Sequence, residues 1–597
     1  MAILKTLRQT DTCPPSGLHP YIDTPDFSYD QWLWYLHNNG LPIGAASGSP
    51  SVAVIGAGVS GLCAAYELMR AGCTVTVFEQ ASDVGGRCAS HLFSTGGTDI
   101  AEMGSMRFPP TEFILDFYLK TSNIVPNGLC SLPDFPDPGV VSTYVCYGNI
   151  APFPWSKSSS SAPAGFETVY KGWVALMQNG LSTDLPGAGT ITAALASGDI
   201  NGATSYWQNY LDVFGQQTFY SALYAIFTGA SGYPIPNGTA WTFDDFDRFG
   251  ALGLGSGGFG PLYPISFMDI FRLIVNELET TQKFLQPSST LTNGIRTLAI
   301  EFGVTLQNNG RPIQTSTPVS SIEPGAGGFV LNGQYGPFDR IIVATTTRAM
   351  ELTLGLTNYV YGPGALISPA VARAIMRTHV VSSNKVAARI SNFWANDPSA
   401  VRCLQTDDLV HQVYTLDYTP VGASSPDSTG VCFISYVWDD DAVKQQALTG
   451  GVPTGPADNQ QLYQYLLNRL AAMGDPVATW TNNLQPLNGD FQNNVVFEEW
   501  QSRPYFAGAF KLSQPGQDKY VQTMFFDQKS LTGGLPDDTG VYIAGDCVSW
   551  TSGWVEGALT TGLNAAAGVI QSLGGTLNPD ASGRTPLTIN ANRYRYF

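Results

Sequence analysis

The feature that most constrains the fold is a glycine-rich turn between a short apolar run and a helix-like segment. The apolar run covers residues 52–55, and the turn after it has the spacing GxGxxG. A second β-branched run, residues 74–78, follows the helix-like segment and ends on an acidic residue. A strand, a glycine turn, a helix and a second strand in this order predict a βαβ unit of a parallel sheet.

Each glycine of this turn has its own physical role. Gly56 permits the tight turn, Gly58 lets the backbone approach a pyrophosphate, and Gly61 lets the helix pack closely on the strand. The helix N-terminus, which includes Ser60, then directs unpaired N–H groups at the phosphates. Glu79 follows about 18 residues after Gly61, near the spacing at which a carboxylate binds ribose hydroxyls. The stretch therefore predicts a dinucleotide site; the alternative is a glycine-rich turn without a ligand.

Composition limits the classes of function. A chain of 597 residues that is 44% hydrophobic and 13% charged is an ordered globular protein with at least two structural units. The formal net charge of -18 argues against nucleic acid and anionic membranes as partners, because both attract basic patches. Residues 1–21 lack the apolar core of a secretory signal or a transmembrane helix, so a cytoplasmic location is expected.

Cysteine and histidine spacing gives no metal signal. The nine cysteines are an odd number without a CxxC pair, which is typical of a reducing compartment. The five histidines show no HExxH or similar ligand spacing. We therefore expect no metal site.

The pattern along the chain predicts one discontinuous nucleotide-binding domain with inserted regions. Aromatic, helix-compatible stretches at 204–227 and 266–285 indicate a helical region, and β-like runs between 317 and 347 indicate hairpins that return to the first sheet. The expected units are an N-terminal extension packed on the body (1–49), the dinucleotide-binding domain (50–114, 286–349 and 536–575), substrate-binding and helical regions (115–285 and 350–535), and a C-terminal tail (576–597).

Two further motifs separate the possible dinucleotides. The sequence GGR at 85–87 resembles the second glycine motif of flavoproteins, where Gly86 recrosses the pyrophosphate and Arg87 neutralises it. The sequence AGD at 544–546, with Gly545 and Asp546, resembles the terminal motif of the same proteins. The resemblance implies an α/β fold: a glutathione-reductase-type FAD-binding Rossmann domain with an inserted α+β substrate domain and a helical region. FAD is thus the expected cofactor.

More narrowly, the chain resembles the flavin amine oxidase family. Within that family it resembles the bacterial tryptophan 2-monooxygenases, with phenylalanine and lysine monooxygenases or oxidases as near relatives. The motifs that carry the resemblance are AEMGSMRFPP (101–110), FPDPGVV (135–141), FGALGLGSGGF (249–259), SYVWDDDA (435–442), AGAFKL (507–512) and GWVEGALTTGLN (553–564).

The resemblance implies roles for six residues in catalysis. Arg107 would pair bidentately with a substrate carboxylate, and its alternative role is a structural ion pair. Lys385 would hold a water against the flavin N5; the alternative is an exposed lysine, although the alternation around it predicts a strand with one face inward. Trp500 and Phe259 would wall the side-chain pocket, or else be ordinary core. In the last motif, the carbonyl of Gly553 would face the substrate amine and the ring of Trp554 would lie beside the flavin.

The resemblance also implies a set of cofactor contacts. The backbone N–H of Val555 would meet the pyrimidine end of the flavin, the backbone of Val319 would meet the adenine, and Asp546 would accept from a cofactor hydroxyl unless it is only a turn carboxylate. The predicted cofactor-binding residues are Gly56, Gly58, Ser60, Gly61, Glu79, Gln80, Gly86, Arg87, Gly104, Ser105, Met106, Arg107, Val319, Gly545, Asp546, Trp554 and Val555.

The activity implied by the resemblance is an FAD-dependent L-amino acid monooxygenase that uses O2 to convert an amino acid, expected to be aromatic, to the amide. The alternatives are an L-amino acid oxidase giving 2-oxo acid, ammonia and peroxide, an oxidase of amines without a carboxylate, a non-catalytic flavin-binding protein and an NAD-dependent dehydrogenase. No acidic residue can be placed from the sequence to meet a basic side chain. Relatives often pair, so a homodimer is the expected assembly.

Overall fold

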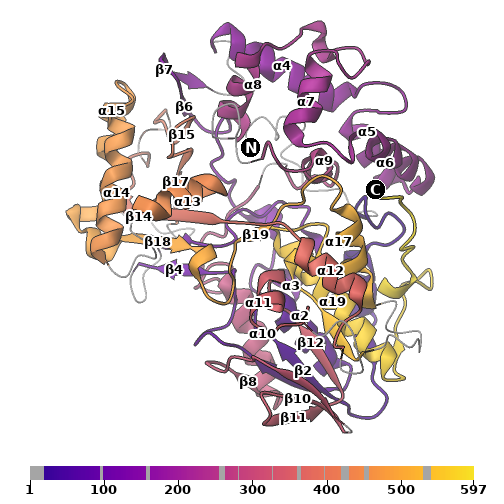
Figure 1. The fold of residues 1–597 in the computed structure, drawn as a ribbon. Helices are drawn as coiled ribbons and strands as arrows, with labels where there is room; N and C mark the ends of the chain where they lie inside the picture. The colour runs from indigo at the N-terminus through magenta and orange to yellow at the C-terminus, as the bar shows by residue number, and fades with distance from the viewer. Residues whose placement is uncertain are drawn as a thin grey trace.

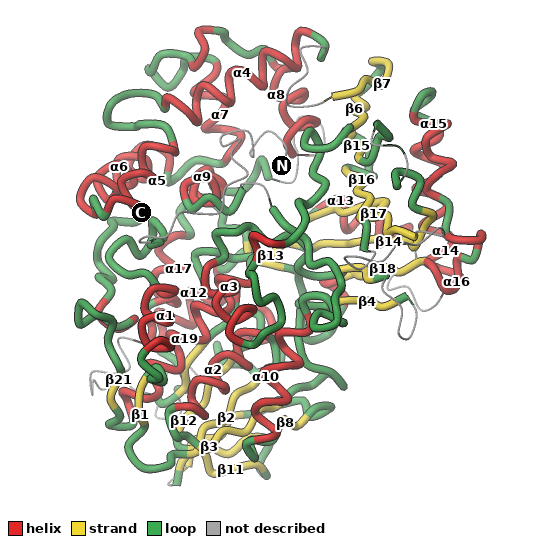
Figure 2. The backbone as a smooth tube through the Cα atoms, turned by 180° about the vertical axis from the view of Figure 1, so that it is seen from behind, coloured by secondary structure: helices red, strands yellow, loops and turns green. Residues whose placement is uncertain are grey.

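The computed structural model describes residues 19–93, 99–155, 162–254, 262–279, 282–325, 327–358, 365–395, 397, 399–418, 429–448, 456–528 and 539–597. The described chain has three parts: a parallel sheet covered by helices, a seven-stranded sheet beside it, and a group of helices above both (Figure 1). Figure 2 shows the same three parts from behind. Among the described residues, no helix combines the length and the hydropathy needed to cross a bilayer.

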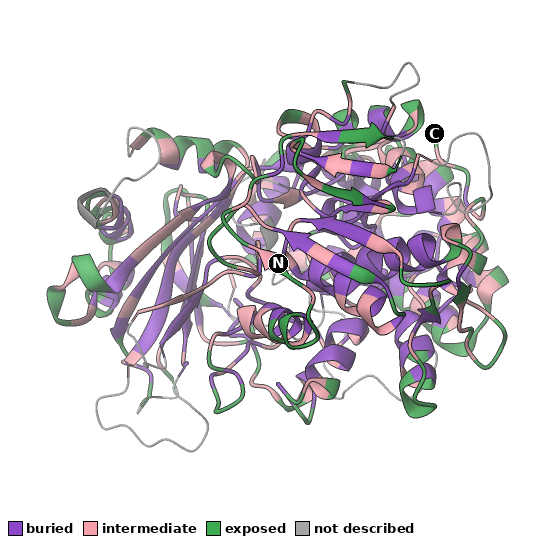
Figure 3. Ribbon diagram, turned by 90° about the horizontal axis from the view of Figure 1, so that it is seen from below, coloured by how far each residue is buried: buried purple, intermediate pink, exposed green. Residues whose placement is uncertain are grey.

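The parallel sheet carries the nucleotide-binding motif. Its strand order is β20-β12-β2-β3-β8, and every neighbouring pair is parallel. Side chains of alternating residues enter two separate apolar clusters, one on each face, so the sheet is buried on both sides (Figure 3). The strands are β2 (Ser51–Ile55), β3 (Thr74–Phe78), β8 (Ile313–Gln314), β12 (Arg340–Val343) and β20 (Val541–Ile543).

The predicted βαβ unit is confirmed. Helix α2 (Val59–Arg70) connects β2 to β3. A Cβ atom on Gly61 would lie 2.1 Å from the carbonyl oxygen of Gly56 and 3.2 Å from Val54, so only glycine allows α2 to approach the strand this closely. Gly56 itself has a φ of 105°, which is the left-handed region that favours glycine.

The strands of residues 322–343 divide between two sheets. β12 pairs with β2 in the parallel sheet, as expected, but the preceding hairpins form a separate antiparallel sheet of order β11-β10-β9. The expectation that the hairpins themselves join the first sheet is wrong. Both sides of β2 and both sides of β12 are already paired within the parallel sheet, so the hairpin strands pair with one another instead. The hairpin strands are β9 (Ile322–Gly325), β10 (Gly328–Leu331) and β11 (Tyr335–Phe338).

The second large sheet has the order β18-β14-β17-β16-β15-β6-β7, antiparallel except for β15 with β6. One face packs on an apolar cluster with helix α14, and the other on a cluster that includes Met106 and Phe135. Its strands and adjoining helices are β6 (Thr143–Tyr147), β7 (Ile150–Trp155), β14 (Ser383–Ser391), β15 (Cys403–Thr406), β16 (Gln412–Leu416), β17 (Thr429–Trp438), β18 (Val495–Glu499), α13 (Asp440–Leu448), α14 (Pro456–Ala471), α15 (Val477–Trp480) and α16 (Phe491–Asn494).

Two strands of this sheet lie where a helical region was expected. β6 and β7 come early in residues 115–285, and the absence of a strand pattern there was a wrong prediction. β7 contains Pro152 and Pro154, which interrupt the pattern of a strand. It tolerates them because it is the edge strand of the sheet.

The helical group contains both aromatic stretches, as predicted, but its helices begin and end at other residues than the stretches do. The stretch 204–227 divides between two helices, and the stretch 266–285 is helical only as far as Val275. The helices are α4 (Ala164–Asn179), α5 (Ala188–Ser197), α6 (Ile200–Phe214), α7 (Phe219–Phe227), α8 (Phe243–Phe249) and α9 (Phe267–Val275).

A buried cation joins this helical group to distant parts of the chain. Arg272, on α9, has a side chain only 1% exposed and forms ion pairs at 2.7–3.0 Å with Asp23, Asp269 and Asp518. These acids come from the N-terminal segment, from α9 itself and from α17. Because an unpaired buried charge is very costly, the three segments are held in one arrangement.

The N-terminal segment packs on the C-terminal part of the chain. Tyr29 donates to Asn564 at 2.6 Å, Trp32 donates to the carbonyl of Asn578 at 2.8 Å, and β1 pairs with β21. The segment contains helix α1 (Tyr29–Asn38), five of whose residues are buried. The remaining elements are α3 (Phe113–Thr121), α10 (Arg296–Asn308), α11 (Thr347–Leu352), α12 (Pro369–Arg377), α17 (Asp518–Phe525), α19 (Val555–Ser572), β1 (Gly44–Ala45), β4 (Ser90–Leu92), β5 (Ile100–Glu102), β13 (Val380–Val381), β19 (Phe510–Lys511) and β21 (Thr576–Leu577).

The cysteines differ from expectation at one position. Cys130 is disulfide-bonded, whereas a chain of uniformly reduced thiols was expected. The other described cysteines are free and buried: Cys63, Cys73, Cys88, Cys146, Cys403, Cys432 and Cys547.

The close packing at Gly61 predicts a stability effect of alanine that depends on position. Gly61→Ala should lower the free energy of unfolding by about 1–3 kcal/mol, because its Cβ meets a backbone oxygen that cannot move away. Gly189→Ala, in the first turn of α5 with no described atom within 4 Å of its Cβ, should instead raise it by about 0.5–1 kcal/mol. Urea denaturation of both variants checks the difference, and equal effects would contradict it.

Candidate active site

A pocket opens at the carboxyl ends of the parallel strands, between that sheet, the seven-stranded sheet and the helical group. Gly58 follows β2, Ala344 follows β12 and Gly545 follows β20, and all three line the pocket. The strands on the two sides of β2, β3 and β12, both follow it in the chain, so the connections run to opposite sides of β2. This is a topological switch point, where open α/β sheets bind ligands.

Most of the predicted site residues line this one pocket. They are Gly58, Ser60, Arg87, Gly104, Ser105, Met106, Arg107, Lys385, Trp500, Gly545, Asp546, Gly553, Trp554 and Val555. The predicted residues that do not line it are Gly56, Gly61, Glu79, Gln80, Gly86 and Val319. Phe259 lies outside the described residues, so its predicted role stays a prediction.

The two glycine motifs form one end of the pocket. Gly58 caps α2 without a side-chain hydrogen bond, and no described atom lies within 4 Å of where its Cβ would be. Gly85 donates to the carbonyl of Ala57 at 2.9 Å, and a Cβ on Gly86 would lie 3.2 Å from the Cα of Gly58. The second motif therefore runs directly against the first. Open space before an uncapped helix N-terminus fits the phosphates of a dinucleotide.

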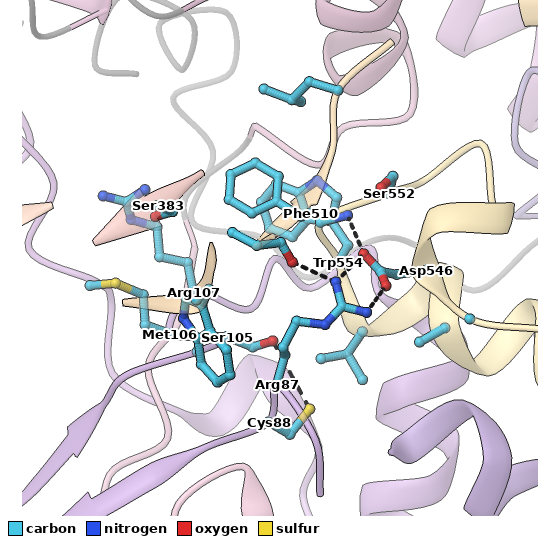
Figure 4. A pocket seen from close by; sticks show the side chains of 18 of the residues that line it. Arg87, Cys88, Ser105, Met106, Arg107, Ser383, Phe510, Asp546, Ser552 and Trp554 are labelled. Atoms are coloured by element: carbon cyan, nitrogen blue, oxygen red, sulfur yellow. Dashed lines mark hydrogen bonds and ion pairs between the residues drawn. The ribbon is translucent and has the colours of Figure 1, made fainter. Parts of the chain in front are cut away.

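Arg87 and Asp546, both predicted to contact the cofactor, pair with each other (Figure 4). One guanidinium nitrogen of Arg87 also donates to the carbonyl of Ala509 at 2.5 Å. Burial disfavours the charged form of Arg87, but Asp546 outweighs it and raises the pKa of Arg87. The pair fixes the turn after β20 against the segment that follows the second glycine motif.

Glu79, Gln80 and Val319 lie together beyond the end of β3. The Glu79 carboxylate accepts hydrogen bonds from the N–H groups of Ala57 at 2.7 Å and Ala81 at 2.8 Å, while Thr317 donates to the Glu79 carbonyl at 2.8 Å. Val319 is buried in the apolar cluster on that face of the sheet. The structure therefore brings these three residues beside the first glycine motif, away from the wider part of the pocket.

Arg107 is a buried cation in the wider part of the pocket. It is 8% exposed, and its guanidinium carbon lies 4.8 Å from the ring centres of Phe135 and Tyr414 and 5.9 Å from that of Tyr436. Its Nε is 3.6 Å from Asp137, an ion pair longer than a hydrogen bond, and Nε and Nη2 have no hydrogen-bond partner among the residues that the structure describes.

The charge of Arg107 is maintained despite its burial. Burial lowers the pKa of Arg107, but the neighbouring Tyr414, Asp137 and Tyr436 raise it to a net value above its ordinary range. A charged, fork-shaped donor with unfilled hydrogen-bonding capacity is suited to a carboxylate ligand.

Lys385 is buried as the alternation around it predicts. It lies on β14, is 2% exposed, and donates to the carbonyl of Glu102 at 3.1 Å and to that of Gly104. Burial and the nearby charge of Arg107 hold the pKa of Lys385 well below its ordinary value. The exposed-lysine alternative is therefore excluded.

Glu102, whose backbone carbonyl accepts from Lys385, has a buried side-chain carboxylate. Burial raises the pKa of Glu102 to about 7, although Ser90 donates to it at 2.7 Å and the N–H of Ile295 at 2.9 Å. Glu102 thus ties β5 to the loop before α10 and fixes the carbonyl that receives Lys385.

The remaining predicted residues lie just after β18 and at the N-terminus of α19. Trp500, directly after β18, donates to the carbonyl of Met103 at 3.2 Å. Gly553 has a φ of 80° and donates to Asp546 at 3.4 Å, and Trp554 is the N-cap residue of α19. The N-terminus of α19 thus opens on the pocket at Val555.

Several lining residues were not assigned a role from the sequence. Tyr436 and Trp438 lie on β17, where Tyr436 pairs in register with Lys385, and Phe510 lies on β19. Their signal was present in the motifs SYVWDDDA and AGAFKL. Glu279 also lines the pocket, although no acidic residue could be placed there from the sequence.

Comparison with known proteins identifies the family. The model for the flavin containing amine oxidoreductases matches residues 59–570. The chain belongs to this family. It is therefore a flavin-dependent oxidoreductase.

Individual relatives cover most of the chain. A tryptophan 2-monooxygenase of Pantoea agglomerans pv. gypsophilae is 38% identical over 88% of this chain and 90% of its own. One of Pseudomonas savastanoi is 37% identical over 92% of this chain and 94% of its own. Among solved structures, a mutant of putrescine oxidase with redesigned cofactor binding is similar with a TM-score of 0.58 at 17% identity, covering 88% and 99% of the two chains. That likeness shows the fold.

The open space at Gly58 predicts a loss of flavin without a loss of fold. Gly58 has an ordinary φ of -69°, and an added Cβ would meet no described atom. The free energy of unfolding of the Gly58→Ala apoprotein should therefore lie within about 0.5 kcal/mol of that of wild type. The added methyl group occupies the side from which phosphates approach, so the flavin dissociation constant should rise about tenfold or more. Flavin titration of the apoprotein measures this, with Gly189→Ala as the control, and unchanged affinity would contradict the phosphate assignment.

Proposed function

We propose that the protein is an FAD-dependent L-amino acid monooxygenase that uses O2 to convert an aromatic amino acid to its amide with loss of carbon dioxide. The observation that carries the proposal is Arg107, a buried cation with unfilled donors in the same pocket as the flavin-binding turn. An amine without a carboxylate would leave this charge unmatched, so the geometry favours amino acids.

FAD, rather than a mononucleotide, is supported by the length of the nucleotide-binding surface. The crossing of Gly58 and Gly86 provides a place for a pyrophosphate, and the group formed by Glu79, Gln80 and Val319 lies beyond it for the adenosine part. A cofactor that extends from this group into the pocket lined by Arg107 would be elongated, as FAD is.

In the proposed mechanism the protein orients the substrate and controls charge. Arg107 binds the carboxylate bidentately, and the rings around it exclude water, which strengthens the pair. The aromatic walls of Trp500, Trp438 and Phe510 position the side chain. The flavin supplies the two-electron oxidation of the α-carbon and reacts with O2. Lys385, with its lowered pKa, holds a proton or a water on the sheet side of the pocket.

The names of the relatives support the amide as product, since the two relatives described above are both tryptophan 2-monooxygenases. The oxidase alternative uses the same residues and differs only in the product. Incubation of the purified protein with each L-amino acid in air, followed by analysis of amide, 2-oxo acid and peroxide, distinguishes them. Amide from an aromatic amino acid is expected. Peroxide with 2-oxo acid would make the protein an oxidase, and turnover of amines alone would reject both.

The role of Arg107 predicts a specific loss of substrate binding. Arg107→Lys keeps the charge but not the fork of donors, so KM for the amino acid should rise roughly 30- to 150-fold while the bound flavin is retained. Steady-state kinetics and the flavin absorbance measure the two quantities. Arg503→Lys changes an arginine with a 55% exposed side chain, paired with Glu498, and should leave both unchanged. An unaltered KM in Arg107→Lys would reject the carboxylate anchor.

Replacing Lys385 should have the opposite effect: the flavin and the amino acid still bind, but turnover slows. Lys385→Met should retain flavin and fold, because burial already disfavours the charged form of the lysine, while turnover falls about 10²-fold. Stopped-flow measurement of anaerobic flavin reduction and of reoxidation by O2 locates the slowed step. Lys444→Met, at a lysine with a 58% exposed side chain, is the control. Normal rates in Lys385→Met would remove it from the mechanism.

A further inference from the structure

Two buried carboxyl groups meet where helices α3 and α19 begin. Glu112 is the N-cap residue of α3, and Glu556 lies in the first turn of α19. Each side chain caps the helix of the other. Glu556 accepts from the N–H groups of Ile114 and Leu115 at 3.0 Å, and Glu112 accepts from the N–H of Glu556 at 3.0 Å. Because capping fixes where a helix begins, the two helix N-termini are held together.

The same turn of α19 faces the candidate active site. Val555 lines the pocket, whereas the next residue, Glu556, contacts α3. The Glu112 carboxyl group also interacts with the N–H of Val555. Cys88, another lining residue, responds to it as well: burial chiefly raises the pKa of the Cys88 thiol, and the charges of Glu102 and Glu112 add to this effect. A charge on Glu112 therefore acts on the wall of the pocket.

No positive group compensates the two carboxyl groups. Glu112 is fully buried and Glu556 is 2% exposed, and among the described residues no cation forms an ion pair with either. The second oxygen of Glu112, Oε2, has no hydrogen-bond partner in that part of the chain. Asp30, on α1, adds a further negative charge beside Glu556 and is itself paired with His19 at 2.9 Å. Two buried carboxylates in such surroundings disfavour each other's ionisation.

A neighbouring hydroxyl distinguishes the two carboxyl groups. Tyr21 donates to the carbonyl of Thr111 at 2.6 Å, and its hydroxyl also interacts with the Glu556 carboxyl group. A hydroxyl has one proton to donate, so its oxygen can only accept from Glu556, which must then be protonated. Burial raises the pKa of Glu556 well above its ordinary value and that of Glu112 to about 8. Glu112 is thus the group that can exchange its proton near neutral pH.

The chemistry of the flavin adds charge close to this group. Hydride transfer brings two electrons and one proton to the flavin, and therefore one negative charge. We propose that Glu112 is a positioning residue that sets the reduction potential of the flavin: its carboxyl group takes up a proton from water as that charge develops at the N-terminus of α19. Glu112 acts through the helix, since it does not itself line the pocket. The inference rests on the proposed function and on the predicted contact of the Val555 N–H with the flavin.

The test is the pH dependence of the reduction potential of the wild-type holoenzyme. Anaerobic titration with dithionite against a reference dye gives the potential over about two pH units on either side of 8. A two-electron couple that takes up one proton falls by about 30 mV per pH unit, and one that takes up two protons falls by about 60 mV. Wild type should show the smaller slope at low pH and the larger one in a range above about pH 8. One constant slope would overturn the inference.

Variants assign the second proton to one side chain. Glu112→Gln keeps an acceptor oxygen for the N–H of Glu556 but cannot titrate, so it should show the smaller slope throughout. Its potential should equal that of wild type at low pH. At high pH it should lie above wild type, by about 30 mV for each tenfold by which flavin reduction weakens Glu112 as an acid. Flavin absorbance confirms that the cofactor is retained.

Two further variants serve as controls. Glu167→Gln removes a carboxylate with a 42% exposed side chain, paired with Lys171 on α4, and should follow wild type. Glu556→Gln should keep the range of larger slope, because Glu556 stays protonated. If the larger slope persists in Glu112→Gln, or is lost in Glu556→Gln instead, the proton belongs to another group and the inference is overturned.

These measurements separate the inference from the proposed function, because dithionite supplies the electrons and no amino acid is present. A holoenzyme with the larger slope above about pH 8 that oxidises no amino acid would support the role of Glu112 and reject only the proposed function. A holoenzyme with one constant slope that converts an amino acid to its amide would reject only the inference.

Discussion

The close approach of two glycine motifs at the switch point of the parallel sheet is the constraint on which the site depends. Gly61 brings α2 against β2, and Gly86 crosses Gly58 so closely that a Cβ on Gly86 would lie 3.2 Å from the Cα of Gly58. Because these contacts involve backbone atoms, small shifts cannot relieve a clash there. They fix the direction of the α2 N-terminus and thereby the position of the cofactor relative to everything that lines the pocket.

The opposite end of the pocket depends on balancing two buried cations. Arg107 and Lys385 belong to the same apolar region, and each charge disfavours the other. Arg107 lies among aromatic rings with Asp137 beside it, whereas Lys385 lies over the rings of Phe433 and Tyr436 and donates to two backbone carbonyls. Arg107 therefore keeps its charge, whereas burial and the charge of Arg107 disfavour the charged form of Lys385.

The sequence predicted local elements well where the chain determines its own geometry. The βαβ unit depends on glycine spacing, and the helical group depends on aromatic, helix-compatible stretches; both are present. β6 and β7 were missed because the prolines of β7 conceal an edge strand, and because β6 joins the sheet through β15, which lies far away in the chain. Family motifs brought Arg107 and Lys385 to one pocket, but Glu279 has no local pattern, and only the packing of α9 against the pocket places it there.

The order of the parallel sheet has a consequence for how this chain is made. The N-terminal motif cannot bury its helix face until α19 packs on α2, and the sheet is incomplete until β20 pairs with β12. Both elements come from the last tenth of the sequence, as does β21, which pairs with β1. During synthesis the face of α2 that packs on α19 therefore stays exposed until most of the chain has been made, although β3 and α10 can pack on this unit earlier. Exposed apolar surface of this kind makes a nascent chain prone to aggregation.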